Sequence, residues 1–467
     1  MSADHVELRS GTYADSVTLL QVSRQIQQLP GVETAQVAMA TPLNVEVLER
    51  MGFAIPGDAT VNHLVVAVRL AQDGDLEAAL VGVDAALTGT RRAAPGSAEE
   101  APPRTTTSAL RREPGSWVLV SVPGASAAVE AMDALEAGSD VMVFSDNVPV
   151  DQEVALKGFA ATRDLLVMGP DCGTAVVAGV GLGFANVVSP GPVGIVAASG
   201  TGCQQVLALL DHAGVGVTTA YGVGGRDLSA EVGGLATRTA LTRLDGDPGV
   251  EVALLISKPP ADEVARELTA YTESLGTPVH LALLGAGRPD LTAAAEDLLR
   301  VLGRTVPDWP VRGETRASTG TRLHGLFVGG TMKQEAEVLV AASGLDPGRS
   351  ELVDFGDDEY TTGRAHPMID PTLRLERLAE VAADDATGVV LMDVVLGHGA
   401  EPDPAESLVP AIEGIRAPVV ITVVGTAHDP QGLERQMSAL AAAGAEVHVS
   451  NARATRRALE ILGAAHE

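Results

Sequence analysis

The chain has 467 residues, too many for a single hydrophobic core, so its length predicts roughly two to four domains. Hydrophobic residues make up 46% of it and aromatic residues only 3%, so the cores must be packed mainly from Ala, Val and Leu. The formal net charge of −29 excludes nucleic acid and anionic membranes as favourable partners. Any anionic ligand would therefore have to be held by local donors and basic groups.

The two cysteines, Cys172 and Cys203, have no metal-ligand spacing and are too few for a disulfide framework. This usage favours a reducing, cytoplasmic location, and no export signal is expected from the N-terminal residues. Residues 172–210 carry no charge over a length that could span a membrane. The Ser-Pro-Gly-Pro stretch at 189–192 would break such a helix, so we expect buried parallel strands in a soluble protein.

The first part of the chain predicts two domains joined by a linker. In residues 1–90, hydrophobic periodicity predicts a strand, a helix, two strands and a second helix, which form a small α/β unit. Residues 91–114 are rich in Pro, Ser, Thr and charges of both signs, which is typical of a linker. Strands alternate with helices in residues 115–190, which predicts a Rossmann-like α/β domain with a doubly wound parallel sheet.

Two further segments follow a common plan. Residues 191–303 and 323–467 each begin with a strand, a glycine turn and a helix, and continue with a strand, a glycine-rich or acidic loop and further alternating elements. A Pro-rich, charged linker at 304–322 separates them. Because a repeat in matching order is a strong signal, we expect two similar α/β lobes related by a pseudo-twofold axis.

Each lobe offers a candidate anion site where its first strand turns into a helix. Backbone N–H groups at a helix start are unpaired and lie at the positive end of the helix dipole, which suits an anion. The turns consist of Ser199, Gly200, Thr201 and Gly202 in the first lobe and of Gly329, Gly330 and Thr331 in the second. Such turns also simply cap helices, but two matched turns favour an anion site. Neither turn has the pattern of a Walker loop or of a dinucleotide fingerprint.

The loop after the second strand of the first lobe adds polar groups. Gly224 and Gly225 are suited to a backbone nest for an anion, and Arg226 offers a planar fork for carboxylate or phosphate.

The corresponding loop of the second lobe is the leading catalytic candidate. Arg364, His366 and Asp370 crowd this loop, and His366 is the best placed residue for acid–base work. His398 and His428 are weaker candidates in later turns. The alternative is that these are solvated surface residues, since many acidic loops have no other role. No His/Asp pair has helical ligand spacing, so no metal site is predicted.

Several blocks of the sequence resemble the FdrA family of the succinyl-CoA synthetase superfamily, the NDP-forming acyl-CoA synthetases. The blocks are VPGASAAVEAMDALEAG at 122–138, SDNVP at 145–149, GPDCGT at 169–174, GPVGIVAASGTG at 191–202, GVGGRDLSAEVGG at 222–234, GRAHPMID at 363–370 and GTAHDPQ at 425–431. The resemblance covers roughly residues 115–467. It implies a synthetase α subunit fused to the carboxy-terminal lobe of a β subunit, with two flavodoxin-like ligase lobes.

The same resemblance implies ligands. Residues 115–190 correspond to a CoA-binding-type domain, which makes CoA a candidate cofactor and assigns Pro123, Gly124, Asn147 and Pro149 to its pocket. In the family the two helix starts face one phosphate site, which here would begin at Thr201 and Thr331.

The sequence also departs from the synthetase pattern. The strand at 278–285 is followed by AGRPDL without the histidine that carries phosphate in the synthetases, and these 467 residues show no ATP-grasp domain. The first glycine-rich CoA loop has no clear equivalent. A complete ATP-driven ligase is therefore not expected from this polypeptide alone.

Three functions follow from the resemblance and these departures. FdrA-like proteins are associated with oxamate carbamoyl transfer in purine (allantoin) catabolism, which implies a transferase subunit that binds phosphate or carbamoyl phosphate. The alternatives are a CoA ligase completed by a separate ATP-grasp subunit, and a non-catalytic subunit that binds CoA or a metabolite. In each case we expect a small anionic ligand and other subunits in a homo- or hetero-oligomer.

Overall fold

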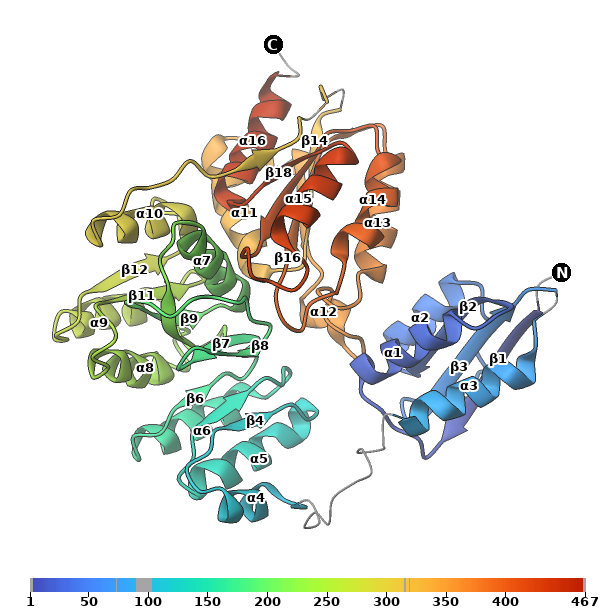
Figure 1. Ribbon diagram of the computed structural model, residues 1–467, viewed down its shortest axis with the longest axis horizontal. Helices are drawn as coiled ribbons and strands as arrows, with labels where there is room; N and C mark the ends of the chain where they lie inside the picture. The colour runs from blue at the N-terminus through green and yellow to red at the C-terminus, as the bar shows by residue number, and fades with distance from the viewer. Residues whose placement is uncertain (1–2, 73, 90–102, 315, 319, 465–467) are drawn as a thin grey trace. The chain divides into compact units, whose positions relative to one another are not determined.

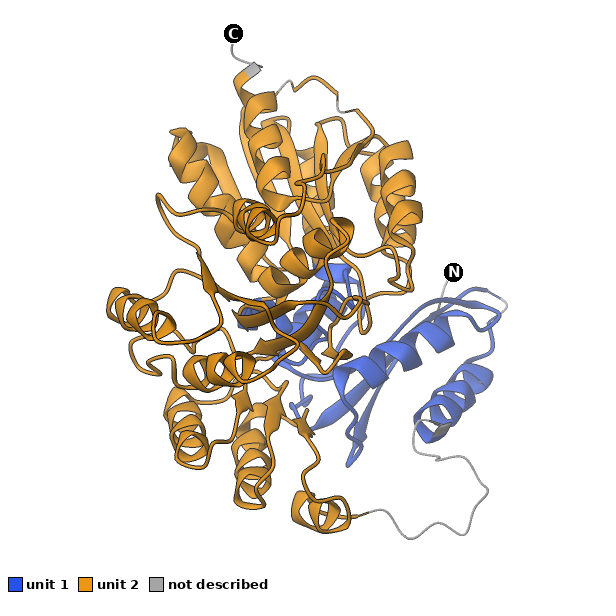
Figure 2. Cartoon of the chain, turned by 60° about the vertical axis from the view of Figure 1, so that its left-hand side comes forward, with its two compact units in different colours: residues 1–102, 357–373 blue, residues 103–356, 374–467 orange. Residues whose placement is uncertain are grey.

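The computed structural model divides into two compact units, coloured separately in Figure 2. Unit 1 combines residues 1–102 with residues 357–373, and unit 2 combines residues 103–356 with residues 374–467. The described residues are 3–72, 74–89, 103–314, 316–318 and 320–464. No helix among them is long and apolar enough to cross a membrane.

Unit 1 is built on an antiparallel sheet with the strand order β1-β3-β2 (Figure 1). Its N-terminal elements are β1 (Ala3–Ser10), α1 (Ser16–Gln27), β2 (Val32–Met39), α2 (Pro42–Arg50), β3 (His63–Leu70) and α3 (Leu76–Gly89). Leu19 and Ile26 of α1 pack with α3 on one face of the sheet, and Leu48 of α2 packs on the other. The expected order of strands and helices is present, with α2 as an addition that Thr41 caps and Pro42 begins.

The second segment of unit 1 comes from much later in the chain. Residues 357–373 contain the short helix α12 (Asp358–Thr361). Asn44 of α2 donates from Nδ2 to the Gly363 carbonyl at 2.9 Å, and Arg24 of α1 donates to the Ile369 carbonyl at 3.2 Å. The second-lobe loop is therefore packed as part of the N-terminal domain, which no sequence pattern indicated.

Unit 2 begins with a parallel sheet in the order β4-β5-β6. The elements are α4 (Thr106–Arg112), β4 (Val118–Val120), α5 (Gly124–Glu136), β5 (Val141–Val143), α6 (Val150–Ala161) and β6 (Val167–Met168). The linker interpretation of 91–114 is wrong at α4, because Thr105 and Ser108 form a capping box and Leu110 is buried. The part of that stretch at 91–102 lies outside the described residues.

The first lobe is a six-stranded sheet in the order β12-β11-β9-β10-β7-β8. Its elements are β7 (Thr174–Val177), β8 (Val180–Gly183), β9 (Val193–Ala198), α7 (Gly200–His212), β10 (Val217–Gly222), α8 (Leu235–Asp245), β11 (Val252–Ser257), α9 (Asp262–Thr272), β12 (Val279–Leu283) and α10 (Leu291–Val301). Strands β9 to β12 are parallel, and the β7–β8 hairpin pairs antiparallel with β10. This hairpin corrects the expected boundary at residue 190, because its strands bond to the first lobe.

The second lobe has the strand order β13-β18-β17-β16-β14-β15. Its elements are β13 (Val311–Arg312), β14 (Arg322–Phe327), α11 (Gly330–Ser343), a 3₁₀ turn (Pro347–Arg349), β15 (Ser350–Asp354), α13 (Thr372–Ala383), β16 (Thr387–Val395), α14 (Pro404–Glu413), β17 (Val419–Val424), α15 (Leu433–Ala442), β18 (Ala445–His448) and α16 (Asn451–Ala464). Strand β13 lies within the expected linker at 304–322 and pairs antiparallel with β18.

The two lobes share one topology. The order β12-β11-β9-β10 of the first lobe is repeated as β17-β16-β14-β15 in the second, so the expected α/β fold class is confirmed. Strands such as β9 and β16 are buried along their whole length, as parallel strands covered on both faces must be. In each lobe the first strand leads into the helix that carries the glycine turn.

Candidate anion-binding site

The two glycine turns meet inside unit 2. The hydroxyl groups of Ser199, before α7, and Thr331, in α11, share a hydrogen bond of 2.5 Å. Ser199 Oγ also accepts the N–H of Gly202 at 2.9 Å and so caps α7. Ser199 is 5% exposed and Thr331 1% exposed. The structure therefore brings together the two turns that the sequence matched.

Glycine is required at this junction because the two turns touch. A Cβ atom on Gly329 would lie 2.7 Å from Thr201 Oγ1. A Cβ atom on Gly202 would lie 2.5 Å from Ser199 Oγ and 3.0 Å from Thr331 Cγ2. A side chain at either position would force the helix starts apart, since close-packed atoms have no room to yield.

Main-chain donors at both helix starts remain open to a ligand. Among the residues that the structure describes, no acceptor pairs with the N–H groups of Gly200, Thr201, Gly330 and Thr331. Gly200, Thr201 and Gly330 are also partly exposed. Together with two helix dipoles, these N–H groups favour a negatively charged ligand.

Lys258, which sequence reasoning missed, adds a positive charge to this junction. It directly follows β11 and is partly exposed. Its Nζ lies 3.3 Å from the position of a Cβ on Gly330 and 3.9 Å from that of a Cβ on Gly225. The ammonium group thus lies between two glycine turns. Its sequence context, Ser-Lys-Pro-Pro, carries no binding motif, so only the strand order of the sheet could have indicated it.

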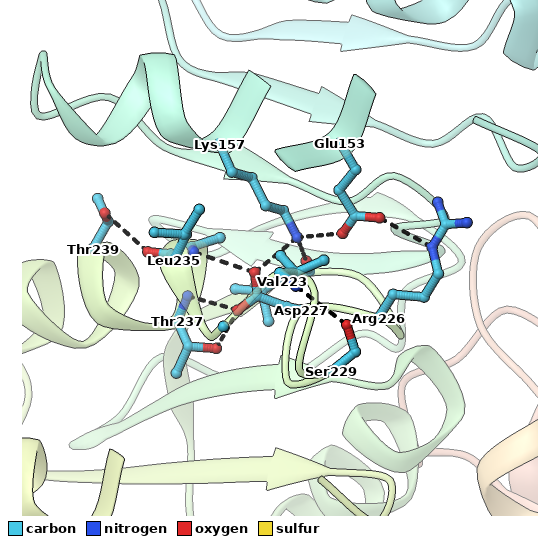
Figure 3. Close-up of polar contacts among 12 residues, drawn as sticks. Glu153, Lys157, Val223, Arg226, Asp227, Ser229, Leu235, Thr237 and Thr239 are labelled. Carbon is cyan, nitrogen blue, oxygen red and sulfur yellow. Dashed lines mark hydrogen bonds and ion pairs between the residues drawn. The ribbon is translucent and has the colours of Figure 1, made fainter. Parts of the chain in front are cut away.

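The loop after β10 is anchored by the buried charge network shown in Figure 3. Lys157 of α6 donates from Nζ to Glu153 Oε1 at 2.7 Å and to Asp227 Oδ1 at 2.8 Å. All three side chains are fully buried. Arg226 donates from Nε to Glu153 Oε2 at 3.0 Å and from Nη2 to the Val148 carbonyl at 2.8 Å. The guanidinium group of Arg226 is therefore held against α6.

Gly224 and Gly225 directly precede Arg226 in this anchored loop. Gly224 has a φ of +87°, and a Cβ atom there would lie 2.5 Å from the Pro170 carbonyl oxygen. That position therefore requires glycine both for its conformation and for the close approach of the 169–174 block. Gly225 is the member of the pair that faces Lys258.

A buried carboxylate accepts main-chain hydrogen bonds at the start of α11. Asp393 accepts the N–H groups of Val328 and Gly329 at 2.7 and 3.0 Å. Arg374 donates to the Asp393 carbonyl at 2.6 Å and to its carboxylate at 3.3 Å. Burial nevertheless raises the pKa of Asp393 to about 6. The turn at Gly329 is thus fixed by hydrogen bonds to β16.

A second buried carboxylate lies one turn further along α11 and joins the lobes. Glu335 accepts the Leu291 N–H of α10 at 2.7 Å and the Asn451 side-chain amide of α16 at 2.8 Å. Burial raises the pKa of Glu335 to about 7, and the nearby Asp290 adds to that rise. Arg456 acts in the opposite direction.

Further buried polar bonds hold the two lobes together. Asp429 accepts the Asn186 side-chain amide at 2.8 Å and the Val187 N–H at 2.7 Å. Gln205 of α7 donates to the Val449 carbonyl at 2.9 Å. The GTAHDPQ block at 425–431 therefore acts in lobe packing through Asp429, and its His428 is exposed.

The predicted catalytic loop residues lie in unit 1. Arg364 donates to Asp370 at 2.7 Å, and their side chains are only 5% and 7% exposed. His366 Nδ1 accepts the Met368 N–H at 3.2 Å. Burial lowers the pKa of His366 to about 4, so its imidazole is neutral at pH 7. Arg364 and Asp370 form a buried pair, and Arg364 also donates to Asn44 of α2.

The remaining candidates lie on the surface or in the core. Gly124 begins α5 after Pro123, and Pro149 precedes α6 directly; neither helix start has a side-chain cap. Asn147 is exposed and has a φ of +53°. His398 is exposed as well. Both cysteines are buried, and burial raises the pKa of both thiols.

Comparison with known proteins gives matches over most of the chain. A CoA-ligase family model matches residues 326–461, and a model described as AllF, heavy metal-associated domain, matches residues 1–103. The uncharacterized protein YahF of Escherichia coli (strain K12) is 36% identical over 490 residues, which cover 94% of this chain and 95% of YahF. The α subunit of ADP-forming succinate–CoA ligase from Methanothermobacter thermautotrophicus is 26% identical over 44% of this chain and 75% of the relative. The apo form of dinucleotide-forming acetyl-coenzyme A synthetase 1 from Ca. Korarchaeum cryptofilum aligns with 75% of this chain and 85% of its own, at 17% identity and a TM-score of 0.28.

Paired α/β lobes that meet at glycine-rich helix starts, together with the match to residues 326–461, define a protein with CoA-ligase-type lobes. The identity with YahF over nearly the whole chain specifies it further. The chain belongs to the FdrA family of the succinyl-CoA synthetase superfamily.

The family description of residues 1–103 implies a heavy metal, and the residues of that domain do not fit one. Both cysteines of the chain lie outside it. Nowhere in the described ranges do three His, Cys, Asp or Glu side chains form a group able to hold a metal ion. In the loop between β1 and α1, Asp15 accepts the Thr18 N–H and caps α1. The domain thus lacks the thiolates that soft metal ions favour, and its described residues form no group of His, Asp and Glu in their place.

Proposed function

We propose that this chain is the phosphate-binding subunit of a carbamoyl-transfer enzyme of the oxamate carbamoyltransferase type, acting in purine catabolism in the cytoplasm. Phosphate or carbamoyl phosphate would bind between the starts of α7 and α11. The observation that carries the proposal is the junction of Ser199 and Thr331, where open N–H groups of two helix starts lie together beside Lys258. In a chain with a net charge of −29, such a local concentration of donors favours an anion.

The proposed reaction needs positioning and charge stabilisation. In the direction that breaks down a carbamoylated 2-oxo amide, a phosphate oxygen attacks the carbamoyl carbon and forms a new C–O bond. The C–N bond to the amide nitrogen breaks, and that nitrogen takes up a proton. The products are carbamoyl phosphate and the free 2-oxo amide. The helix starts would orient the phosphate and stabilise the charge that moves between its oxygens and the carbamoyl group.

The proposal assigns residues to these tasks. The N–H groups of Thr201 and Thr331 bind phosphate oxygens, and Lys258 balances their charge in place of Arg226, which is paired with Glu153. The sequence-based role of His366 in proton transfer stays a prediction. Full activity of a His366→Ala variant would remove it from the mechanism.

A CoA ligase is the second candidate, favoured by the CoA-ligase match to residues 326–461 and by the relatives named as CoA ligases. The exposed residues Asn147 and Pro149 and the uncapped start of α5 at Gly124 would hold CoA, which supplies a thiol as acyl acceptor. The loop at 284–290 contains no histidine, so the phosphate relay would need another residue and a separate ATP-grasp subunit. Labelling with ATP and such a partner would leave an acid-labile phosphohistidine only in this case.

The test is turnover in the reconstituted complex. Phosphate and a carbamoylated 2-oxo amide are supplied, and carbamoyl phosphate is measured as it forms. The proposal predicts turnover that Gly329→Ala abolishes and that Gly158→Ala preserves, since a Cβ at Gly158 meets nothing within 4 Å. Phosphate binding without turnover would instead identify a binding subunit, and equal turnover in both variants would reject the site.

A further inference from the structure

The loop after β15, residues 357–373, is bound to the N-terminal residues of unit 1 through one buried side-chain amide. Asn44 of α2 is 2% exposed. Its Nδ2 donates to the carbonyls of Met39 and Gly363, each at 2.9 Å, and its Oδ1 accepts from Arg364 at 3.4 Å. One side chain therefore joins its own domain to a segment more than 300 residues later.

The rest of the segment is built into the same packing. The Arg364–Asp370 ion pair is buried, and the Asp370 carboxylate also accepts the N–H of Thr372 at 3.1 Å. Arg24 of α1 donates to the Ile369 carbonyl at 3.2 Å. A segment with a buried ion pair and two side chains of another domain on its carbonyls is fixed by that domain.

Both ends of the segment connect to the start of α11 within unit 2. Before residue 357 the chain leaves β15 at Asp354, whose carboxylate lies 2.5 Å from the position of a Cβ on Gly330. After residue 373 comes Arg374, which donates to Asp393, and the Asp393 carboxylate accepts the Gly329 N–H at 3.0 Å. On either side, only a few residues of chain separate the held segment from Asp354 and Arg374, which reach the start of α11 through contacts.

We propose that the N-terminal domain is a metal-free clamp that controls the anion site of the second lobe through its hold on residues 357–373. When Asn44 and Arg24 hold the segment, its two ends keep Asp354 and Arg374 in place, and the start of α11 keeps the geometry that binds an anion. The domain acts by docking a segment of its own chain, and it carries no metal. The inference rests on the proposed function only for the choice of phosphate as ligand.

The test combines hydrogen exchange with phosphate titration of the full chain. Asn44→Ala removes the bridging amide, and Glu46→Ala on the exposed face of the same helix is the matched control. In Asn44→Ala we expect the amides of 357–371 and of 328–334 to exchange roughly tenfold faster than in the wild type. The dissociation constant for inorganic phosphate should rise about tenfold as well. Glu46→Ala should match the wild type in both.

Arg24→Ala provides an independent variant if Asn44→Ala does not fold, and the same changes are expected from it. Unchanged exchange of 357–371 in the folded variants would overturn the clamp. Faster exchange there, with 328–334 and phosphate affinity unchanged, would overturn its control of the site. If the wild type bound no phosphate, the proposed function would be wrong. The exchange rates at 328–334 would still test whether the N-terminal domain controls the start of α11. Stoichiometric binding of Zn²⁺ or Cu⁺ lost on deletion of residues 1–90 would overturn the metal-free assignment.

Discussion

The two lobes share the order of four parallel strands, yet they fix the corresponding loop in different ways. In the first lobe the loop after β10 is anchored by fully buried ions, with Lys157 between Glu153 and Asp227. In the second lobe the loop after β15 leaves the lobe and is held by hydrogen bonds from the N-terminal domain. Gly225 of the first loop faces Lys258, and the strand before the second loop ends at Asp354, beside the start of α11. The repeated scaffold therefore does not fix these loops by itself, and each needs support from another part of the chain.

The kind of support determines how each loop can respond. A buried charge network tolerates no missing partner, because a single unpaired ion in the interior is strongly unfavourable. Hydrogen bonds from side-chain amide to backbone contribute only about 0.5–1.5 kcal/mol each and can be exchanged for water. We therefore expect the first loop to be lost only when unit 2 unfolds. The hydrogen bonds from Asn44 and Arg24 to the second loop should open more easily, although that loop keeps its own buried Arg364–Asp370 pair.

The largest effect should come from breaking the first anchor. Lys157→Met leaves Glu153 and Asp227 buried without their shared cation, and we expect the free energy of unfolding of unit 2 to fall by about 3–5 kcal/mol. Chemical denaturation measures this fall. Lys333→Met, which removes a partly exposed ion pair with Glu337 on α11, should cost less than about 1 kcal/mol. Equal losses in the two variants would show that the network is not an anchor.

The next effect concerns the junction of the lobes. Gly329→Ala places a Cβ atom 2.7 Å from Thr201 Oγ1, so we expect phosphate affinity to fall by roughly a hundredfold or more. Isothermal titration with the Gly158→Ala variant as the control checks this. An unchanged dissociation constant in Gly329→Ala would mean that phosphate binds elsewhere.

Lys258 should contribute less than the main-chain donors, because it is partly exposed. We expect Lys258→Met to weaken phosphate binding about tenfold at low salt, and less as ionic strength rises. Lys333→Met removes the same charge from the first turns of α11 and should change the affinity less than about twofold. If the two lysine variants behave alike, the effect of Lys258 is one of net charge and not of position.

Features that repeat as a local sequence pattern could be predicted, whereas contacts between distant segments could not. The repeated glycine turns predicted two lobes with a common order of elements, because that order follows from local sequence pattern. The facing of the two helix starts was implied by the family resemblance. Lys258 and Glu335 carry no motif and become visible only when distant strands and helices are packed together. The Asn44 side-chain amide donates to the main-chain carbonyl of Gly363, which is distant in the sequence, and a main-chain carbonyl leaves no pattern from which this bond could be predicted.

The smallest effect is a pH dependence at the lobe interface. Burial raises the pKa of Glu335 from 4.5 to about 7, so the folded state holds this proton more tightly than the unfolded chain. Its contribution to stability is therefore present below about pH 4.5 and is lost as the pH rises towards 7. Asp393, with a pKa of about 6, acts in the same direction.

We expect Glu335→Gln to reduce the fall in unfolding free energy between pH 5 and pH 8 by about 1–2 kcal/mol. Thermal denaturation across this range measures the slope, with the exposed Glu337→Gln as the control. A slope that Glu335→Gln leaves as steep as in the wild type would show that Glu335 is already ionised at the interface.

The most direct test of the anion site is a crystal structure of the full chain with phosphate. Our account predicts a tetrahedral anion between the starts of α7 and α11, within hydrogen-bond distance of the N–H groups of Thr201 and Thr331 and of Lys258 Nζ. Saturating phosphate that leaves this junction empty, or that binds only at another place on unit 2, would contradict it.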